Sequence, residues 1–260
     1  MRDYEEIKVF IDKEIQKICF PDSPNLLYDP INYIIALKAK RMRPVLVLLA
    51  HQLFNKEINN AIYPAIAIEI FHNFTLLHDD IMDNAPLRRG EPTVHEKWDK
   101  NTAILAGDTM LIHAYKMISK VDNSILKNVL DVFSQAAKEV CEGQQKDMEF
   151  EGDYTVTLKE YMKMIENKTA VLLAASLKIG GITAGASLES QDHLYEFGKN
   201  IGIAFQLKDD LLDTFGTPKK FGKKVGGDII ANKKTFLYLK TLQLADTQDC
   251  QKLKLYYQDN

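Results

Sequence analysis

Helical spacing of apolar residues runs through most of the chain and limits what it can fold into. Stretches with this spacing cover residues 44–54, 63–84, 102–118, 126–150, 167–185 and 192–213. A further stretch near the N-terminus repeats apolar residues at three- and four-residue steps, as a helix with one buried face requires: Ile7, Phe10, Ile11, Ile15 and Ile18. Two-residue alternation, the pattern of a half-buried strand, is scarce. The pattern predicts an all-α fold, an antiparallel helical bundle.

The segments between these stretches contain the Pro, Gly and Asp residues that mark loops. They cover residues 21–30, 86–93, 152–157 and 216–227. None of them has the composition of an interdomain linker, and no repeat of about 20 to 50 residues is present. We therefore expect one domain over residues 1–260.

Composition and charge exclude several classes of protein. The formal net charge is −3, from 33 basic and 36 acidic residues, so no overall attraction to nucleic acid or to an anionic membrane surface is expected. The three cysteines form no disulfide framework, which indicates a reducing compartment. The N-terminus is too charged for a signal peptide, and no apolar run approaches the roughly 20 residues of a membrane span. We expect a cytoplasmic protein.

One acidic motif occurs twice, at residues 78–83 (His-Asp-Asp-Ile-Met-Asp) and 208–213 (Lys-Asp-Asp-Leu-Leu-Asp). Its first and last aspartates are four residues apart, so on a helix they lie one above the other at about 5–6 Å. Magnesium binds few carboxylates together with phosphate oxygens and water. A single motif of this kind is more often a solvated helix face, but two copies at the ends of apolar helices predict a metal–diphosphate site.

Basic residues flank the first acidic motif. Residues 40–44 (Lys-Arg-Met-Arg-Pro) precede a helical stretch, and Arg88-Arg89-Gly90 follows the motif. The planar guanidinium group of arginine suits diphosphate oxygens. His72 lies seven residues before Asp79, about 20° around the helix, and so on the carboxylate face. These groups predict that anions bind beside the metal site.

The order of these motifs resembles that of trans-polyprenyl diphosphate synthases of the short-chain type, which make farnesyl or geranylgeranyl diphosphate. The resemblance covers roughly residues 35 to 240 and rests on residues 40–44, 78–83, 88–93, 143–144, 168–169 and 205–213. It implies a helical bundle of the class I terpenoid synthase type. The activity implied is the condensation of isopentenyl diphosphate with an allylic diphosphate, in a homodimer.

The resemblance also implies a role for individual residues. Asp79 and Asp83, with Asp209, would hold three Mg²⁺ ions, and Lys168 would act with them in catalysis. The allylic diphosphate would be bound by Arg88, Lys168, Thr169, Gln206, Lys223 and Lys233. Isopentenyl diphosphate would be bound by Lys40, Arg43, His72 and Arg89.

The length of the product would depend on the helix that carries Asp79. In this family a bulky side chain at the fifth position before the first aspartate blocks the growing chain, and here that residue is Phe74, with Thr75 after it and Phe71 one turn earlier. This predicts a product of fifteen or twenty carbons. The alternatives are that both phenylalanines are ordinary core residues, or that the product is longer.

Two other functions are alternatives to the synthase. A class I terpene cyclase typically carries one such acidic motif and needs no isopentenyl diphosphate site, and a non-catalytic partner subunit would have degenerate motifs, whereas both are intact here. Family members generally continue through further helices after the segment that matches Lys233-Lys234-Thr235. We therefore expect a shortened C-terminus.

Overall fold

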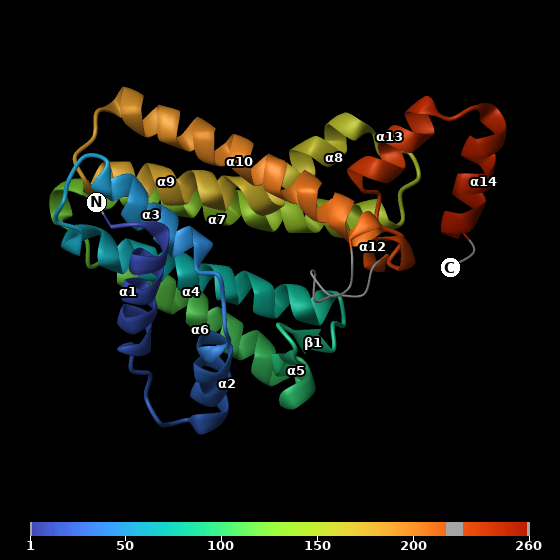
Figure 1. Cartoon of the computed structure of the whole chain (residues 1–260). Coiled ribbons are helices and arrows are strands. Elements are labelled where there is room, and N and C mark those ends of the chain that lie inside the picture. Colours follow the sequence, from blue (N-terminus) through green and yellow to red (C-terminus); the bar gives the residue numbers. More distant parts are fainter. Residues whose placement is uncertain (1, 217–225, 259–260) are drawn as a thin grey trace. The chain divides into compact units, whose positions relative to one another are not determined.

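The computed structural model describes residues 2–216 and 226–258 and is helical almost throughout (Figure 1). The chain divides into two compact units, Met1–Ser134 with Ala174–Glu196, and Gln135–Leu173 with Phe197–Asn260. Three helices contribute residues to both units: α7 (Asn123–Glu151), α9 (Val171–Thr183) and α10 (Leu188–Phe215). The all-α prediction is confirmed, while the single domain stays a prediction.

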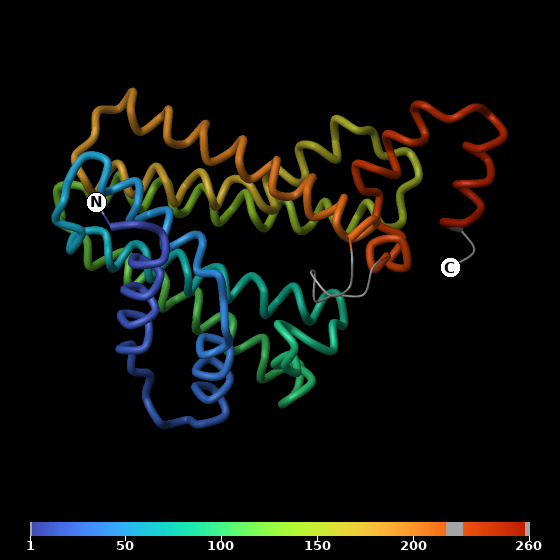
Figure 2. The backbone as a smooth tube through the Cα atoms, in the orientation of Figure 1, coloured from blue at the N-terminus to red at the C-terminus, as the bar shows by residue number. Residues whose placement is uncertain are grey.

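The first unit is built around α4 (Asn59–Met82), which packs against α6 (Lys100–Ile118) and α3 (Met42–Gln52). Figure 2 shows α4 and α6 side by side and running in opposite directions. The other elements of this unit are α1 (Tyr4–Gln16), α2 (Asn25–Ala36), β1 (Leu87–Arg88), β2 (Glu91–Pro92) and α5 (Val94–Lys97). Its largest fully buried side chains include those of Phe71, Phe133, Leu48, Ile68 and Met110.

Helix α1 follows the sequence pattern closely. A capping box links Asp3 and Glu6 at its start, which satisfies backbone N–H groups that have no partner within the helix. Ile7, Ile11 and Ile15 are buried. The helix ends at Gln16, so the last residue of the predicted stretch, Ile18, lies beyond it.

The prediction of a loop over residues 21–30 is wrong in its second half, because α2 begins at Asn25 and contains Pro30. A proline inside a helix removes one backbone hydrogen bond and costs about 3 kcal/mol. Burial of Ile31, Ile34 and Ile35 on one face of α2 offsets this cost, since each buried aliphatic side chain contributes about 1.5–3 kcal/mol.

The second unit contains the C-terminal helices and a separate small core. Its elements are α8 (Leu158–Ile165), η1 (Glu166–Ala170), α12 (Gly227–Ile230), α13 (Phe236–Leu244) and α14 (Thr247–Gln258). Helix α13 packs against both α8 and α14. The core cluster consists of Phe150, Val156, Tyr161, Met164, Ile165, Tyr238, Leu239 and Tyr257.

Element η1 is a π-helical turn between α8 and α9, and it contains Lys168 and Thr169. Two glycines let neighbouring helices approach it closely. A Cβ atom on Gly143 of α7 would lie 2.2 Å from the backbone nitrogen of Lys168, and one on Gly202 of α10 would lie 2.4 Å from the Cα atom of Ala170. The turn is therefore confined on two sides by backbone.

No helix in residues 2–216 and 226–258 combines the length and the apolar character that a membrane crossing requires.

We predict that Gly143→Ala destabilises the protein, although residue 143 lies within a helix, where alanine is usually favoured over glycine. Alanine favours a helix by up to about 1 kcal/mol over glycine, but its Cβ would overlap backbone atoms of η1, which no side-chain rotation can relieve. Such overpacking costs about 1–3 kcal/mol. Chemical denaturation measures the change, with Gly152→Ala as the control, because a Cβ there meets nothing within 4 Å. Equal stability of the two variants would contradict the close approach.

Candidate active site

The first acidic motif lies at the C-terminal end of α4, where its two outer aspartates keep helical spacing. The N–H group of Asp83 donates to the carbonyl of Asp79 at 2.9 Å, so both residues belong to the same turn. The side chain of Asp79 is 20% exposed and Asp83 is exposed. Asp80, between them, is buried. The predicted helical spacing of Asp79 and Asp83 is therefore present at this helix end.

Arg88 is held by this motif. Its Nε donates to Asp80 Oδ1 at 2.9 Å, and its Nη2 lies 3.5 Å from Asp79 Oδ2. Burial raises the pKa of Asp80, against the hydrogen bond and charge of Arg88, which lower it. The residue predicted to bind the allylic diphosphate is thus bound here to the carboxylates beside it.

The tight turn that joins β1 to β2 begins directly after Arg88 and contains Arg89. Arg89 and Gly90 have positive φ angles of 57° and 85°, the combination that a two-residue hairpin turn of type I′ needs. Arg89 is exposed at this turn. The two arginines therefore present their side chains differently although they are adjacent.

One arginine of the basic cluster before α3 is buried and stabilises the fold. Arg41 is buried and caps α3 in the left-handed conformation, with φ at 52°. Its guanidinium group contacts Asp12 at 2.9 Å and Glu69 at 2.6 Å, and it donates to the carbonyl of Ile35 at 2.8 Å. Arg41 thus ties the start of α3 to three other segments.

The neighbouring cations of this cluster remain closer to the surface. Lys40 is exposed, and Arg43 is half-buried with its Nη1 at 3.0 Å from Nε2 of His72 on α4. Burial lowers the pKa of His72 well below its ordinary value, and the nearby arginines, Arg43 first among them, lower it further. A neutral imidazole can accept the hydrogen bond that Arg43 offers. Two of the residues that the resemblance assigns to isopentenyl diphosphate are therefore in contact.

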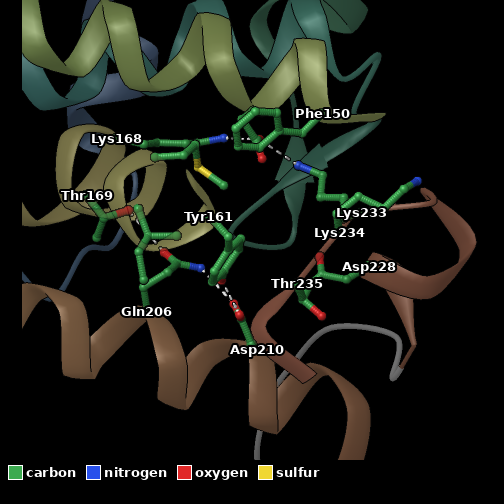
Figure 3. Close-up of a pocket in the computed structure, with 13 residues that line it drawn as sticks. Phe150, Tyr161, Lys168, Thr169, Gln206, Asp210, Asp228, Lys233, Lys234 and Thr235 are labelled. Carbon is green, nitrogen blue, oxygen red and sulfur yellow. Dashed lines mark hydrogen bonds and ion pairs between the residues drawn. The ribbon is translucent and has the colours of Figure 1, made fainter. Parts of the chain in front are cut away.

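A pocket in the second unit brings together another group of the predicted residues (Figure 3). Lys168, Thr169, Gln206 and Lys233 all line it. The hydroxyl of Thr169 donates to Gln206 Oε1 at 3.0 Å, and Gln206 Nε2 donates to Asp210 Oδ1 at 3.1 Å. The rest of the lining is Asp147, Phe150, Tyr161, Met164, Ile165, Asp210, Asp228, Lys234 and Thr235.

Asp147 on α7 joins two lysines of this pocket. Its Oδ2 lies 2.7 Å from the Nζ of Lys168 and 3.1 Å from that of Lys233. Figure 3 shows these two lysine side chains directed toward one another. Burial alone would raise the pKa of Asp147, but the charges of Lys168 and Lys233 and their hydrogen bonds lower it below its ordinary value. This carboxylate therefore stays ionised and fixes the spacing of the two ammonium groups.

The sequence interpretation missed Asp147, although a signal for it was present. It follows Gly143 by four residues, which places it one turn along the same face of α7. That face is the one that approaches η1 and Lys168. Gly143 therefore indicated the face of α7 on which an acidic partner for Lys168 could lie.

In the second acidic motif, the aspartates that accept hydrogen bonds are not the same positions as in the first. Asp210 is buried and accepts hydrogen bonds from the hydroxyl of Tyr161, from Gln206, and from the backbone N–H of Phe236 at 3.3 Å. Asp213 is buried and accepts from the backbone N–H of Asp228 at 3.0 Å. Asp209 is half-buried, and its side chain has no hydrogen bond or ion pair with the described part of the chain. Asp213 is thus a structural anchor rather than the partner of Asp209.

The residues predicted to limit product length lie on α4. Phe74 is 8% exposed and its ring contacts those of Phe71 and His78, with centroids 5.5 and 4.8 Å away. Phe71 is fully buried and also packs against Phe133. Thr75 is half-buried and donates to the carbonyl of His72. The role of these residues in chain length stays a prediction.

The described residues contain no group of three or more His, Cys, Asp or Glu side chains placed to hold a metal ion by themselves. Asp79 and Asp83 form a pair, and a pair of carboxylates fits magnesium when phosphate oxygens and water supply its other ligands. Lys223, a predicted ligand, lies outside the described residues.

Comparison with known proteins agrees with the motifs. The sequence profile of the polyprenyl synthetase family matches residues 24–260. A short chain isoprenyl diphosphate synthase from Methanocaldococcus jannaschii is 42% identical over 243 residues, which are 93% of this chain and 71% of that protein. A geranylgeranyl diphosphate synthase from Methanosarcina mazei is 40% identical over 235 residues, 90% of this chain and 72% of that protein.

A solved structure agrees as well. The crystal structure of a geranylgeranyl pyrophosphate synthase matches with a TM-score of 0.94 and 47% identity, over 99% of this chain and 78% of that one. The chain therefore belongs to the polyprenyl synthetase family, as the order of its motifs predicted, and it is a prenyltransferase with the all-α terpenoid synthase fold.

We predict that Asp147→Asn lowers stability at neutral pH and has less effect in acid. The loss of the charge removes hydrogen bonds between charged groups, worth about 1.5–3 kcal/mol. Because the folded-state pKa lies below the ordinary 3.8, the stabilisation is complete above that pH and is lost as the pH falls through the folded-state value. Denaturation of wild type and variant at pH 7 and in acid measures this difference. Asp131→Asn, at an exposed position of α7, is the control, and a pH-independent difference for Asp147→Asn would contradict the assignment.

Proposed function

We propose that this protein condenses isopentenyl diphosphate with an allylic diphosphate to give a trans-prenyl diphosphate of fifteen or twenty carbons. One observation carries the proposal: the chain has two separate groups of cationic side chains, and each group lies near its own copy of the acidic motif. A reaction between two diphosphates needs two such sites. The names of the relatives support the same activity.

The isopentenyl diphosphate site is assigned to the first unit. Arg43 and His72 are in contact, and Lys40 and Arg89 are exposed. This contact holds the guanidinium group of Arg43 in place. It does not neutralise the positive charge of Arg43, because the imidazole of His72 is neutral. Charge-assisted hydrogen bonds from such groups to a diphosphate are about twice as strong as neutral ones.

The allylic diphosphate site is assigned to the pocket of the second unit. Lys168 and Lys233 would bind its oxygens, with Thr169 and Gln206 as hydrogen-bonding partners. Asp147 carries one negative charge against the two positive charges of these lysines and holds both of their ammonium groups at the pocket. The family resemblance also assigns to this diphosphate Arg88, which lies in the first unit, and Lys223.

Magnesium is the proposed cofactor, bound through Asp79, Asp83 and Asp209, with three ions expected in the complex. When bound, it would offset the negative charge of the diphosphate and favour its departure. The exposed position of Asp83 and the partial exposure of Asp79 and Asp209 support this assignment.

The chemistry that these residues support is ionisation followed by carbon–carbon bond formation. Lys168 and Lys233 stabilise the diphosphate as the allylic C–O bond breaks and its electron pair leaves with the pyrophosphate. The double bond of isopentenyl diphosphate then forms the new carbon–carbon bond to the allylic cation. The proton lost in the last step passes to the released pyrophosphate, which lies in the same site.

The protein is also proposed to be a homodimer located in the cytoplasm. The dimer rests on the family resemblance, and the location rests on the composition of the chain. Sedimentation equilibrium with the purified protein distinguishes a dimer from a monomer.

We predict that Asp79→Ala and Asp209→Ala each reduce turnover by about a hundredfold or more, because each change removes a group that stabilises the leaving diphosphate through magnesium. The assay uses magnesium, radiolabelled isopentenyl diphosphate and an allylic diphosphate, followed by product sizing. Asp131→Ala, at an exposed position on α7, should retain wild-type turnover. Full activity in excess EDTA would refute the metal requirement.

We predict that Phe74→Ala lengthens the product by at least one five-carbon unit, and that adding Phe71→Ala lengthens it again. Removal of each buried ring opens space along α4 that the packed side chains now fill. Chromatographic sizing of the products measures the change, with Phe197→Ala, at an exposed phenylalanine, as the control. A wild-type product of thirty carbons or more would show that Phe74 does not limit length.

A further inference from the structure

Lys234, the residue after Lys233, has a buried ammonium group whose hydrogen bonds are fully satisfied. Lys234 is 4% exposed. Its Nζ donates to the carbonyl of Asn232 at 2.8 Å, to Asn232 Oδ1 at 2.9 Å and to the carbonyl of Glu151 at 3.2 Å. An ammonium group has three N–H donors, so all of them have acceptors.

Three tyrosine rings surround the same ammonium group. The centroid of Tyr154 lies 4.4 Å from Nζ, and those of Tyr238 and Tyr257 lie 5.8 Å from it. The rings of Tyr238 and Tyr257 also pack on each other with centroids 4.2 Å apart. Within the described residues Lys234 forms no ion pair with a carboxylate, so cation–π attraction compensates its burial. We call Lys234 with these three rings the tyrosine cage.

The tyrosine cage joins segments that are distant in sequence. Glu151 ends α7, Tyr154 lies in the following loop, Tyr238 belongs to α13 and Tyr257 to α14. Tyr154 also accepts a hydrogen bond from Asn232 Nδ2 at 3.3 Å. The short stretch that contains Lys233 is therefore held from outside the pocket by several independent contacts.

Lys233 and Lys234 extend in different directions from this stretch. Both residues line the pocket, but Lys233 reaches Asp147, whereas the ammonium group of Lys234 is directed to Asn232 and Glu151 (Figure 3). Lys233 is a long, flexible side chain, and its Nζ lies 3.1 Å from a carboxylate oxygen of Asp147. The place at which this side chain enters the pocket is set by the backbone that it shares with Lys234.

We propose that Lys234 and the tyrosine cage, including Tyr257 of the C-terminal helix α14, are positioning residues that hold Lys233 in the allylic diphosphate site. The proposal rests on the proposed function for the identity of the anion. It also assigns a role in substrate binding to α14, which contributes no side chain to the pocket itself.

The test is a double-mutant cycle on Lys233 and Lys234. The probe is inorganic pyrophosphate with magnesium, and isothermal titration calorimetry measures its affinity for wild type, Lys233→Ala, Lys234→Met and the double variant. If Lys234 acts through Lys233, Lys234→Met weakens binding about tenfold when Lys233 is present and has almost no effect when Lys233 is alanine. Equal weakening in both backgrounds would overturn the proposal, as would unchanged affinity with a lower melting temperature.

A second pair of variants tests the ring and keeps the proposal falsifiable if Lys234→Met does not fold. Tyr257→Phe retains the aromatic face and should bind pyrophosphate as wild type does, whereas Tyr257→Leu should bind it several-fold more weakly. Equal affinities of these two variants would contradict the cage. Lys252→Met, at an exposed lysine of α14, controls for loss of charge on that helix.

Steady-state kinetics separate this proposal from the proposed function. In the condensation assay, Lys234→Met should raise the Michaelis constant for the allylic diphosphate about tenfold and leave that for isopentenyl diphosphate within about twofold. A wild-type protein that binds pyrophosphate but forms no product would refute the proposed function, while the binding cycle would still decide the role of Lys234.

Discussion

The pocket of the second unit depends on one carboxylate that holds two ammonium groups. Two like charges that lie close together repel, and the repulsion is stronger where less water surrounds them. Asp147 contacts both Lys168 and Lys233 and so offsets this repulsion before any anion arrives. The cations are then already in place when the diphosphate binds, and less ordering of side chains accompanies binding.

Adjacent aspartates have different roles in both acidic motifs. Asp80 is buried against Arg88 while Asp79 is partly exposed, and Asp210 is buried against Tyr161 while Asp209 is half-buried. Neighbours on a helix differ by about 100° in direction. The buried member of each pair can therefore fix the helix end while the other is presented for binding. Lys234 and Lys233 divide their roles in the same way outside a helix.

Apolar spacing in the sequence was sufficient for the long helices α4, α6, α7 and α10 and for the spacing of Asp79 and Asp83, because helix periodicity is local. It predicted no helix over most of α2, or over α8, α13 and α14. The sequence pattern could not show that Arg41 is more buried than Arg43. The burial of Arg41 depends on Glu69 and Asp12, which are both distant in sequence. Asp147 was missed for the same reason, because both of its partners lie on other elements. Asp213 had the predicted spacing, yet its carboxylate binds the backbone of Asp228.

The π-helical turn η1 sets the rotational phase of the helices that it joins. A π turn accommodates one more residue than an α turn, so deletion of a single residue from Glu166–Ala170 would let the segment become continuous α-helix. Helix α8 would then be rotated by about 100° about its axis. Tyr161, which now donates to Asp210, would point elsewhere, and the apolar face of α8 would leave the core of the second unit. The rotation of α8 about its axis is therefore as important to the pocket as the residues that line it.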